Sequence, residues 1–231
     1  MANWWDSLAV FDTETTGLST RDDRIVTAYV GILGPGGEVV DAYSWLADPG
    51  VVIPPQATAV HGVSTEQAQR EGRAAPEVVA EVVEKLRWVH SLEIPLVVYN
   101  ASYDLSLCYR EAQRYGVEPV GNPRPVVDPL VIDRALDPYR KGKRTLDVVA
   151  GHYGVVNPAA HNAEGDAVTA GLVARALGAR FADQLADVDA LHDQQVDWAY
   201  SWAQNFKRYL ENQGRLARGL SGAWPLDEGL D

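Results

Sequence analysis

Two acidic residues stand at the end of an apolar stretch near the N-terminus. Asp12 and Glu14 follow residues 8–11, a run long enough for a buried strand. Side chains alternate between the two faces of a strand, so residues i and i+2 point the same way and the two carboxylates are expected side by side. Unpaired, they would repel each other, whereas a hard divalent cation binds such oxygens. A lone pair of this kind is more often a strand that ends in solvated acids, so the interpretation depends on matching acids elsewhere.

Matching acids occur much further along the chain. Asp104 is expected in the first turn of a helix that follows a short apolar strand, and Asp166 in the first turns of a helix that follows His161. Taken singly, each is more often a helix cap or a partner of the helix dipole. Yet all four acids lie at the edges of elements, and sites in mixed sheets form outside the strand ends. The joint pattern therefore predicts one site that contains Asp12, Glu14, Asp104 and Asp166.

The elements that must position these acids begin with strands and then alternate. Strands are predicted at residues 8–11, 24–33, 38–46, 95–99 and 125–127, and the Gly-Pro-Gly-Gly turn at residues 34–37 makes the first three antiparallel. Helices are predicted at residues 77–89, 100–115, 129–136, 146–153, 161–178 and 183–212. This order predicts an α/β fold, a mixed five-stranded sheet flanked by helices.

The C-terminal part differs from the rest. We expect a first domain at residues 1–180, followed by a helical extension and tail at residues 181–231. Apolar and aromatic residues recur at helical spacing along residues 183–212, which favours an amphipathic helix packed on its own domain. A surface for a protein partner such as a DNA polymerase is the alternative. The tail from residue 219 onward is expected to be mobile.

Composition limits the classes of function. The formal net charge of −12 argues against extended contact with nucleic acid, although a site with two divalent cations inverts the field locally. A single cysteine, Cys108, excludes an intrachain disulfide and a cysteine-rich zinc site. There is no secretory leader and no apolar run of about 20 residues. We therefore expect a soluble, cytoplasmic protein with no membrane partner.

Three motifs, in order, resemble those of the DEDDh 3′-5′ exonucleases, the group that includes the proofreading epsilon subunit of bacterial DNA polymerase III. They are Phe11-Asp-Thr-Glu-Thr-Thr-Gly17, then Tyr99-Asn-Ala-Ser-Tyr-Asp104, then His161 and Asp166 separated by four residues. Residues 60–63 and 145–154 also resemble segments of that family, and the resemblance covers roughly residues 6–178. Each motif alone is modest, but their order and spacing together are specific. The resemblance implies an RNase H-like fold.

The resemblance also implies a reaction and a set of roles. Nucleotides would be removed one at a time from a 3′ end with the help of two divalent cations, Mg²⁺ or Mn²⁺, about 3.5–4 Å apart. Asp12 would bridge the two ions, Glu14 and Asp166 would hold the ion that activates water, and Asp104 would hold the other through water. His161 would act as the general base, since imidazole has an unperturbed pKa near ~6.5.

Further residues are candidates for holding the terminal nucleotide. Several belong to the first two motifs, and one histidine lies in the 60–63 segment: Thr15, Thr16, Gly17, Leu18, Asn100, Tyr103 and His61. For His61 a role in a turn is equally expected, and for Asn100 and Tyr103 the alternative is a role in packing only. The basic loop at residues 140–144 either meets phosphates upstream or is a solvated loop. The favoured substrate is the 3′ end of single-stranded DNA, with RNA or short oligonucleotides as the alternative.

Two other classes of function compete with this prediction. Haloacid dehalogenase-like phosphatases carry D-x-D-x-T after an apolar strand, but here Glu14 replaces the second aspartate, and such an enzyme needs no histidine and aspartate like His161 and Asp166. A non-catalytic module for nucleic acid or polymerase binding would be favoured by the loss of an acid, yet all four are present. The products separate the three: nucleoside monophosphates, free phosphate, or none.

Overall fold

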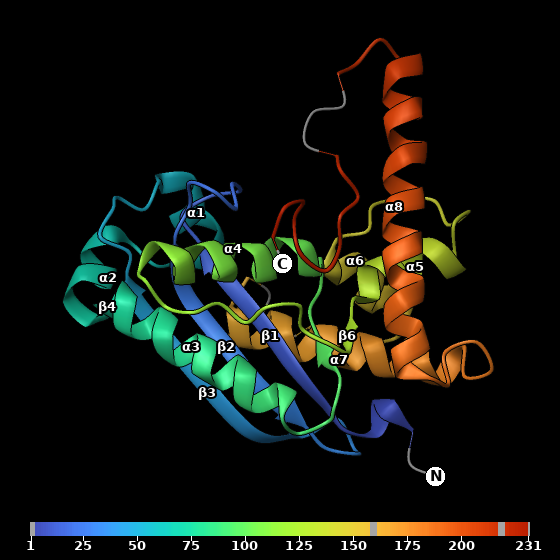
Figure 1. Ribbon diagram of the computed structural model, residues 1–231, viewed down its shortest axis with the longest axis horizontal. Helices are drawn as coiled ribbons and strands as arrows, with labels where there is room; N and C mark the ends of the chain where they lie inside the picture. The colour runs from blue at the N-terminus through green and yellow to red at the C-terminus, as the bar shows by residue number, and fades with distance from the viewer. Residues whose placement is uncertain (1–2, 158–160, 217–219, 231) are drawn as a thin grey trace.

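The computed structural model describes residues 3–157, 161–216 and 220–230 of the chain (Figure 1). Its centre is a six-stranded sheet with the order β4-β3-β2-β1-β5-β6. The strands are β1 (Leu8–Thr15), β2 (Ile25–Leu33), β3 (Val39–Asp48), β4 (Arg73–Ala74), β5 (Leu96–Val97) and β6 (Val126–Val127). Strand β2 is antiparallel to its neighbours β1 and β3, and the remaining pairings are parallel.

The predicted fold class is confirmed, with one difference in the number of strands. The sixth strand, β4, is only two residues long and pairs with Ala47 and Asp48 at the end of β3. Two residues carry no readable alternation of apolar and polar side chains, so sequence patterns miss a strand of this length. The predicted strand at residues 95–99 is likewise reduced to β5, which pairs with β1 over only two positions.

Helices cover both faces of this sheet. They are α1 (Pro55–His61), α2 (Thr65–Glu71), α3 (Ala75–His90), α4 (Ala101–Arg114), α5 (Pro129–Leu136), α6 (Leu146–His152), α7 (Ala163–Arg180) and α8 (Val188–Asn212), preceded by the 3₁₀ turn η1 (Trp4–Asp6). Helices α3 and α4 lie on one face, and α7 crosses the other (Figure 1). Among the described residues, none of these helices combines the length and apolar character that crossing a membrane requires.

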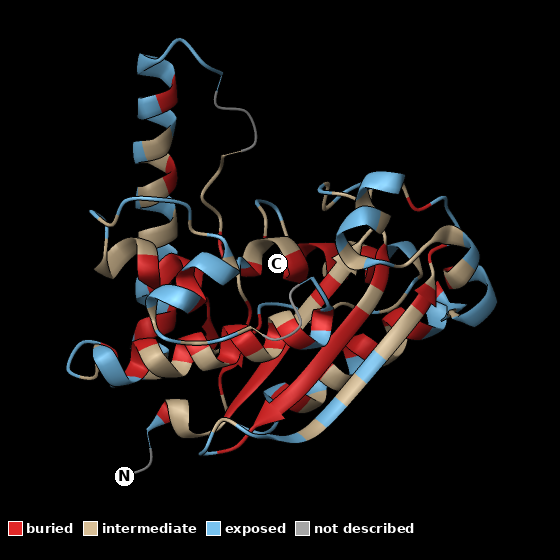
Figure 2. Ribbon diagram, turned by 180° about the vertical axis from the view of Figure 1, so that it is seen from behind, coloured by how far each residue is buried: buried red, intermediate tan, exposed pale blue. Residues whose placement is uncertain are grey.

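Strand β1 is central and buried on both faces (Figure 2). Ala9 and Phe11 pack into the cluster formed with α3 and α4, whereas Leu8 and Val10 pack into the cluster formed with α7. This explains why residues 8–11 are all apolar rather than alternating, since a strand covered on both sides has no polar face. The strand continues to Thr15, so Asp12 and Glu14 of the first motif lie within its last four residues.

A close approach of backbones sets the position of α7 against β1. Gly171 lies so near the strands that an added Cβ would meet Leu33 Cδ1 at 2.5 Å and Val10 Cγ1 at 2.6 Å. A larger residue there would push α7 away from the sheet. Because Asp166 lies in the first turns of the same helix, this contact also sets how far that carboxylate is from the end of β1.

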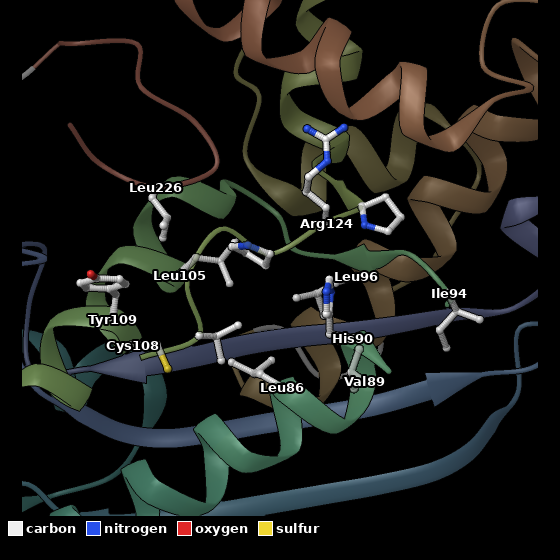
Figure 3. Close-up of a pocket in the computed structure, with 13 residues that line it drawn as sticks. Leu86, Val89, His90, Ile94, Leu96, Leu105, Cys108, Tyr109, Arg124 and Leu226 are labelled. Atoms are coloured by element: carbon white, nitrogen blue, oxygen red, sulfur yellow. The ribbon is translucent and has the colours of Figure 1, made fainter. Parts of the chain in front are cut away.

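The C-terminal part departs from the prediction in two ways. Helix α8 begins at Val188 rather than at residue 183, because the side chain of Asp187 caps it through the N–H groups of Asp189 and Ala190. The prediction of a mobile tail is wrong for residues 220–230, since Trp224 and Leu226 are buried in the cluster that contains α3 and α4. Figure 3 shows Leu226 beside a cavity of ≈ 20 Å³ that is lined mostly by apolar side chains.

Candidate active site

Three of the predicted acids meet at the carboxyl end of β1. Asp12 and Glu14 come from the strand and Asp166 from α7, and ligand atoms of the three carboxylates all lie within 4.8 Å of one another. The side chains of Asp12 and Glu14 share one face of the strand, as the two-residue spacing predicts. Within the part of the chain that the structure describes, this is the one such group suited to holding a metal ion.

The third acid is held in place by the start of its helix. Asn162 caps α7, and its side-chain oxygen accepts hydrogen bonds from Glu164 N at 2.9 Å and Gly165 N at 3.3 Å. The Asp166 carboxylate accepts two further bonds, from Asn157 Nδ2 at 2.8 Å and from His161 N at 3.2 Å. These bonds orient the carboxylate toward the strand. No motif in the sequence singles out Asn157.

The fourth acid, Asp104, lies beside this group but is bound differently. It is 4% exposed, and its Oδ1 accepts hydrogen bonds from Thr13 N at 3.1 Å and from Thr13 Oγ1 at 2.6 Å. Asp104 is in the first turn of α4, and that turn begins where the backbone N–H groups of Asn100 and Ala101 donate to the buried carboxylate of Asp128. Thr13 thus ties the second motif to the first, a role that its position between two acids did not reveal.

All four carboxylates have raised pKa values, and the neighbouring acids contribute to the shifts of Asp12 and Glu14. Burial, and then the charges of Asp104, Asp166 and Glu14, hold the pKa of Asp12 well above its usual range. Burial, followed by the charge of Asp166, raises the pKa of Glu14 to about 7. Burial raises the pKa of Asp104 to about 7 and also raises that of Asp166. So many acids at one strand end carry a charge that a divalent cation would neutralise, and an all-oxygen set of this kind suits a hard cation.

His161 lies at the edge of the acid group. Its backbone has a φ of +64°, a left-handed conformation that is uncommon outside glycine, and its N–H donates to Asp166. A positive charge on its imidazole would lower the pKa of Glu14, which places the ring near that carboxylate. The residue is exposed. An exposed imidazole next to two acids that could hold a metal ion is positioned to meet a molecule that approaches from solvent.

The turn after β1 is stiffened by the same hydroxyls that were predicted to bind a nucleotide. Thr15 Oγ1 donates to Gly17 O at 2.7 Å, and the hydroxyl of Tyr103 donates to the same carbonyl. Thr16 Oγ1 donates to Asp23 Oδ1 at 2.8 Å. These groups shape the turn from within, whereas the side chain of Leu18 is 92% exposed at its tip. Leu18 is therefore the residue of the turn that is free to touch a ligand.

His61 lies at the end of α1 and lines a cleft of ≈ 250 Å³ that also contains Glu14 and Asn162. Its Nδ1 accepts a hydrogen bond from Val63 N at 3.2 Å, and its buried Nε2 has no partner among the described residues. Burial lowers the pKa of His61. The imidazole therefore serves the turn, and an interaction with the backbone of Thr15 places it close to the end of β1. Asn100 instead lines a separate cleft between α5, α8 and the C-terminal tail.

Two of the four cations in the basic loop at residues 140–144 are paired inside the protein, whereas Lys141 and Lys143 are exposed. Arg140 and Arg144 both form ion pairs with Asp133, whose side chain is fully buried. Arg144 also donates to the carbonyl oxygen of Asp137 at 2.5 Å. Of the two interpretations left open by the sequence, neither describes these two arginines, because their charges are used inside the protein.

Comparisons with known proteins agree with this geometry. A family model described as exonuclease, RNase T, matches residues 9–173. The PolC-type DNA polymerase III of Oceanobacillus iheyensis is 31% identical over 166 residues, which cover 72% of this chain and 11% of that protein. The PolC-type enzyme of Listeria monocytogenes is 30% identical over 222 residues, covering 94% of this chain and 14% of that protein.

Solved structures show the same fold. The structure of exonuclease I has a TM-score of 0.63 at 18% identity, covering 77% of this chain and 42% of that one. The complex of E. coli exonuclease I with a dT13 oligonucleotide has a TM-score of 0.61 at 19% identity, covering 78% and 43%. This chain thus spans only 11–14% of the two curated relatives described.

Together, the fold, the acid group and the family match define a class of protein. The chain belongs to the RNase T group of DEDD exonucleases, enzymes that degrade nucleic acid from the 3′ end. Its four carboxylates at the end of β1 and at the starts of α4 and α7 stand where the four acids of the motifs were predicted to meet. Proteins of this family use divalent cations, and the all-oxygen donor set fits such ions.

Proposed function

We propose that this protein hydrolyses the phosphodiester bond at the 3′ end of single-stranded DNA and releases nucleoside 5′-monophosphates. The observation that carries the proposal is the group formed by Asp12, Glu14 and Asp166, whose ligand atoms lie within 4.8 Å of one another. Asp104 adds a fourth acid beside it. A site with this charge is suited to cation-assisted phosphoryl chemistry and has no evident structural purpose, since it raises the pKa values of its own members.

The four acids would hold two divalent cations, Mg²⁺ or Mn²⁺. Asp12, Glu14 and Asp166 would hold one, and Asp12 together with Asp104 the other. When bound, these ions supply positive charge for the attacking and the leaving oxygen of an in-line displacement. The protein's own part is to fix the carboxylates, which it does through Thr13 on Asp104 and Asn157 on Asp166.

His161 would be the general base. It would take a proton from the attacking water, because its exposed imidazole lies beside Glu14 and Asp166 while its backbone N–H is anchored to the latter. The bond from phosphorus to the 3′ oxygen of the preceding nucleotide then breaks, and that oxygen leaves with a proton from solvent. General base catalysis of this kind contributes about 10²- to 10⁴-fold to a rate.

The terminal nucleotide would lie between the turn after β1 and His61. The tip of that turn presents Leu18 to solvent, Tyr103 supports it from α4, and His61 lines the cleft that also contains Glu14. Thr15, Thr16 and Gly17 would act mainly by holding the turn in shape. Asn100 would contribute through its backbone at the start of α4.

DNA is the favoured substrate because of the relatives. The curated relatives are DNA polymerases of the PolC type, and exonuclease I has been solved with dT13. Proofreading with a polymerase, on which α8 would be the docking element, follows from the same similarity. In this scheme residues 1–180 form the exonuclease domain, residues 181–231 form its extension, and the protein works in the cytoplasm. The net charge of −12 favours a short contact with the strand.

A gel assay tests the proposal. Single-stranded DNA and RNA oligonucleotides with a 5′ label are incubated with the protein and Mg²⁺ or Mn²⁺. We expect a metal-dependent ladder that shortens from the 3′ end, faster for DNA, and absent for Asp12→Ala. A faster ladder with RNA would move the substrate to RNA or short oligonucleotides. No ladder with either metal would leave a binding module on this fold, and release of free phosphate would instead indicate a phosphatase.

A further inference from the structure

The C-terminal tail, residues 220–230, returns from α8 to the active-site side of the sheet (Figure 1). It contacts two parts of the site that are far from it in sequence. One is the turn loop, defined here as residues 17–24, which follows the first motif. The other is α4, which carries Asp104. The family motifs end before this tail begins, so its contacts belong to no motif of the sequence.

One carboxylate of the tail joins the turn loop to α4. Asp227 Oδ2 accepts a hydrogen bond from Thr20 Oγ1 at 2.7 Å and lies 2.6 Å from Arg110 Nη1. Arg110 Nη1 also donates to Thr20 Oγ1 at 2.7 Å, which closes a three-membered network. The side chain of Arg110 is only 12% exposed and that of Asp227 35% exposed, so the ion pair is partly shielded from water. Charge-assisted bonds of this kind are stronger than neutral ones.

The tail backbone also forms a hydrogen bond with α4, and a second tail side chain binds the carboxylate that caps this helix. The N–H of Asp227 donates to Ser106 Oγ at 2.7 Å, and Ser106 is fully buried. Trp224 Nε1 donates to Asp128 Oδ2 at 3.2 Å. Asp128 is the carboxylate that receives the first N–H groups of α4. The tail therefore binds α4 at its start and again at Ser106, two residues beyond Asp104.

The turn loop is held from its inner side and from its outer side. On its inner side it is held by Asp23, which accepts bonds from Thr16 Oγ1 and from Ser19 N at 2.7 Å. Its outer side carries Leu18, whose side chain is exposed, and then Thr20. Thr20 joins that outer side to the body of the protein through its bonds with Asp227 and Arg110, and Arg114 Nη2 of α4 donates to Arg21 O at 2.7 Å.

We propose that Asp227 is a positioning residue, which holds the turn loop against α4 so that the loop is already ordered when a 3′-terminal nucleotide binds. This inference rests on the proposed function. Without the Asp227 carboxylate, the loop samples more conformations. Ordering it when substrate binds then costs conformational entropy, which weakens the binding free energy. The cost falls on binding more than on the chemical step, because the metal-binding acids on β1 and α7 do not touch Asp227.

The test compares Asp227→Asn with Glu228→Gln, a neighbouring acid in the same tail that is exposed. We expect Asp227→Asn to raise KM for a single-stranded DNA oligonucleotide about 3- to 20-fold with kcat changed less than about threefold. Glu228→Gln should match the wild type. Thr20→Val should raise KM similarly and add little to Asp227→Asn, since both variants weaken the one network formed by Thr20, Asp227 and Arg110. Amide hydrogen exchange should become faster at residues 18–24 in Asp227→Asn.

Two results would overturn the inference. A lower melting temperature with unchanged KM and unchanged exchange at residues 18–24 would make Asp227 a stabilising residue only. Equal effects of Asp227→Asn and Glu228→Gln would assign any change to the charge of the tail. If the wild-type protein degrades no oligonucleotide, the proposed function fails separately. Amide hydrogen exchange in the turn loop of Asp227→Asn then still shows whether Asp227 orders the loop. Unchanged exchange would contradict that role.

Discussion

Two groups of acids in this molecule are treated in opposite ways. Asp133, on α5, is fully buried and is met by Arg140, Arg144 and the hydroxyl of Tyr153 at 2.9 Å. The acid group at the end of β1 has no such partner, because no lysine or arginine among the described residues forms an ion pair with any of its four carboxylates. One group contains its counter-charges, and the other lacks them.

The role of a buried acid depends on whether the protein supplies a cationic partner for it. A carboxylate with its own arginines is part of the structure, and removing it leaves cations unpaired. Carboxylates that raise one another's pKa values cost the free protein stability, and they persist in a fold when something else supplies the positive charge. The contrast therefore indicates a stabilising role for Asp133 and a role in the reaction for the acids at the end of β1. Variants of either group test this difference.

The largest effect is expected from Asp12→Asn. The variant keeps the shape of the side chain and removes the charge that binds the cations, so exonuclease activity should fall by on the order of 10³-fold or more. At pH 8 without metal, the same variant should melt at a higher temperature than the wild type, because it relieves repulsion. Activity assays and thermal unfolding in EDTA measure both.

Asp183→Asn, which changes an exposed acid, is the control for charge alone. If Asp12→Asn lowered the melting temperature in EDTA while Asp183→Asn had no effect, the carboxylate of Asp12 would be a stabilising group and the contrast with Asp133 would fail.

The next effect concerns His161→Ala. Loss of the base should reduce kcat about 10²- to 10⁴-fold while Mn²⁺ still binds to the acid group. Titration calorimetry measures the metal affinity, and the gel assay measures the rate. His90→Ala, an exposed histidine at the end of α3, should leave both unchanged. Full activity of His161→Ala would remove the residue from the reaction.

On the structural side, Asp133→Asn should destabilise the protein by about 3–5 kcal/mol, since Arg140 and Arg144 lose a buried counter-charge. Urea unfolding measures the loss of free energy of unfolding. Activity per folded molecule at low temperature should change little, because Asp133 belongs to no part of the acid group. A strong fall in activity with unchanged stability would reverse the assignment of the two groups.

The smallest effect is the dependence of stability on pH. Burial and neighbouring charges raise the pKa of Glu14 from 4.5 to about 7, so between these values the folded protein binds more protons than the unfolded chain. The contribution of Glu14 to stability therefore falls as pH rises from about 4.5 to about 7 in EDTA. Mg²⁺ or Mn²⁺ should restore stability above pH 7. Melting curves of the wild type and Glu14→Gln at pH 5.5 and 8 in EDTA isolate the contribution, which is absent if the two proteins respond alike.

Much of the fold was predictable from local pattern. Residues 8–11 are apolar without interruption because β1 is covered on both faces, and the helix at Pro129–Leu136 has the predicted bounds. The first motif places two carboxylates on one face of a strand by the period of two alone. Such features depend on neighbours in sequence, which a pattern can display.

The tail and the basic loop were not predictable in this way. Residues 220–230 have no helical or strand period, yet Trp224 and Leu226 are buried by elements about 100 residues or more away. Arg140 and Arg144 read as solvated cations until Asp133 is found beneath them. In both cases the partner is close in space and unmarked in the sequence.

The sequence by itself determined which residue types stand at the ends of which elements: two acids on one strand, one at the start of each of two helices, and a histidine beside the last. The three-dimensional arrangement decided which acids, among the described residues, lie without a cationic partner, where a metal ion could bind, and which are paired with arginines inside the protein. It also brought Asp227 to Thr20, 207 residues away in the chain. The reason is that electrostatic energy depends on distance through space and on burial, and neither is a property of order along the chain.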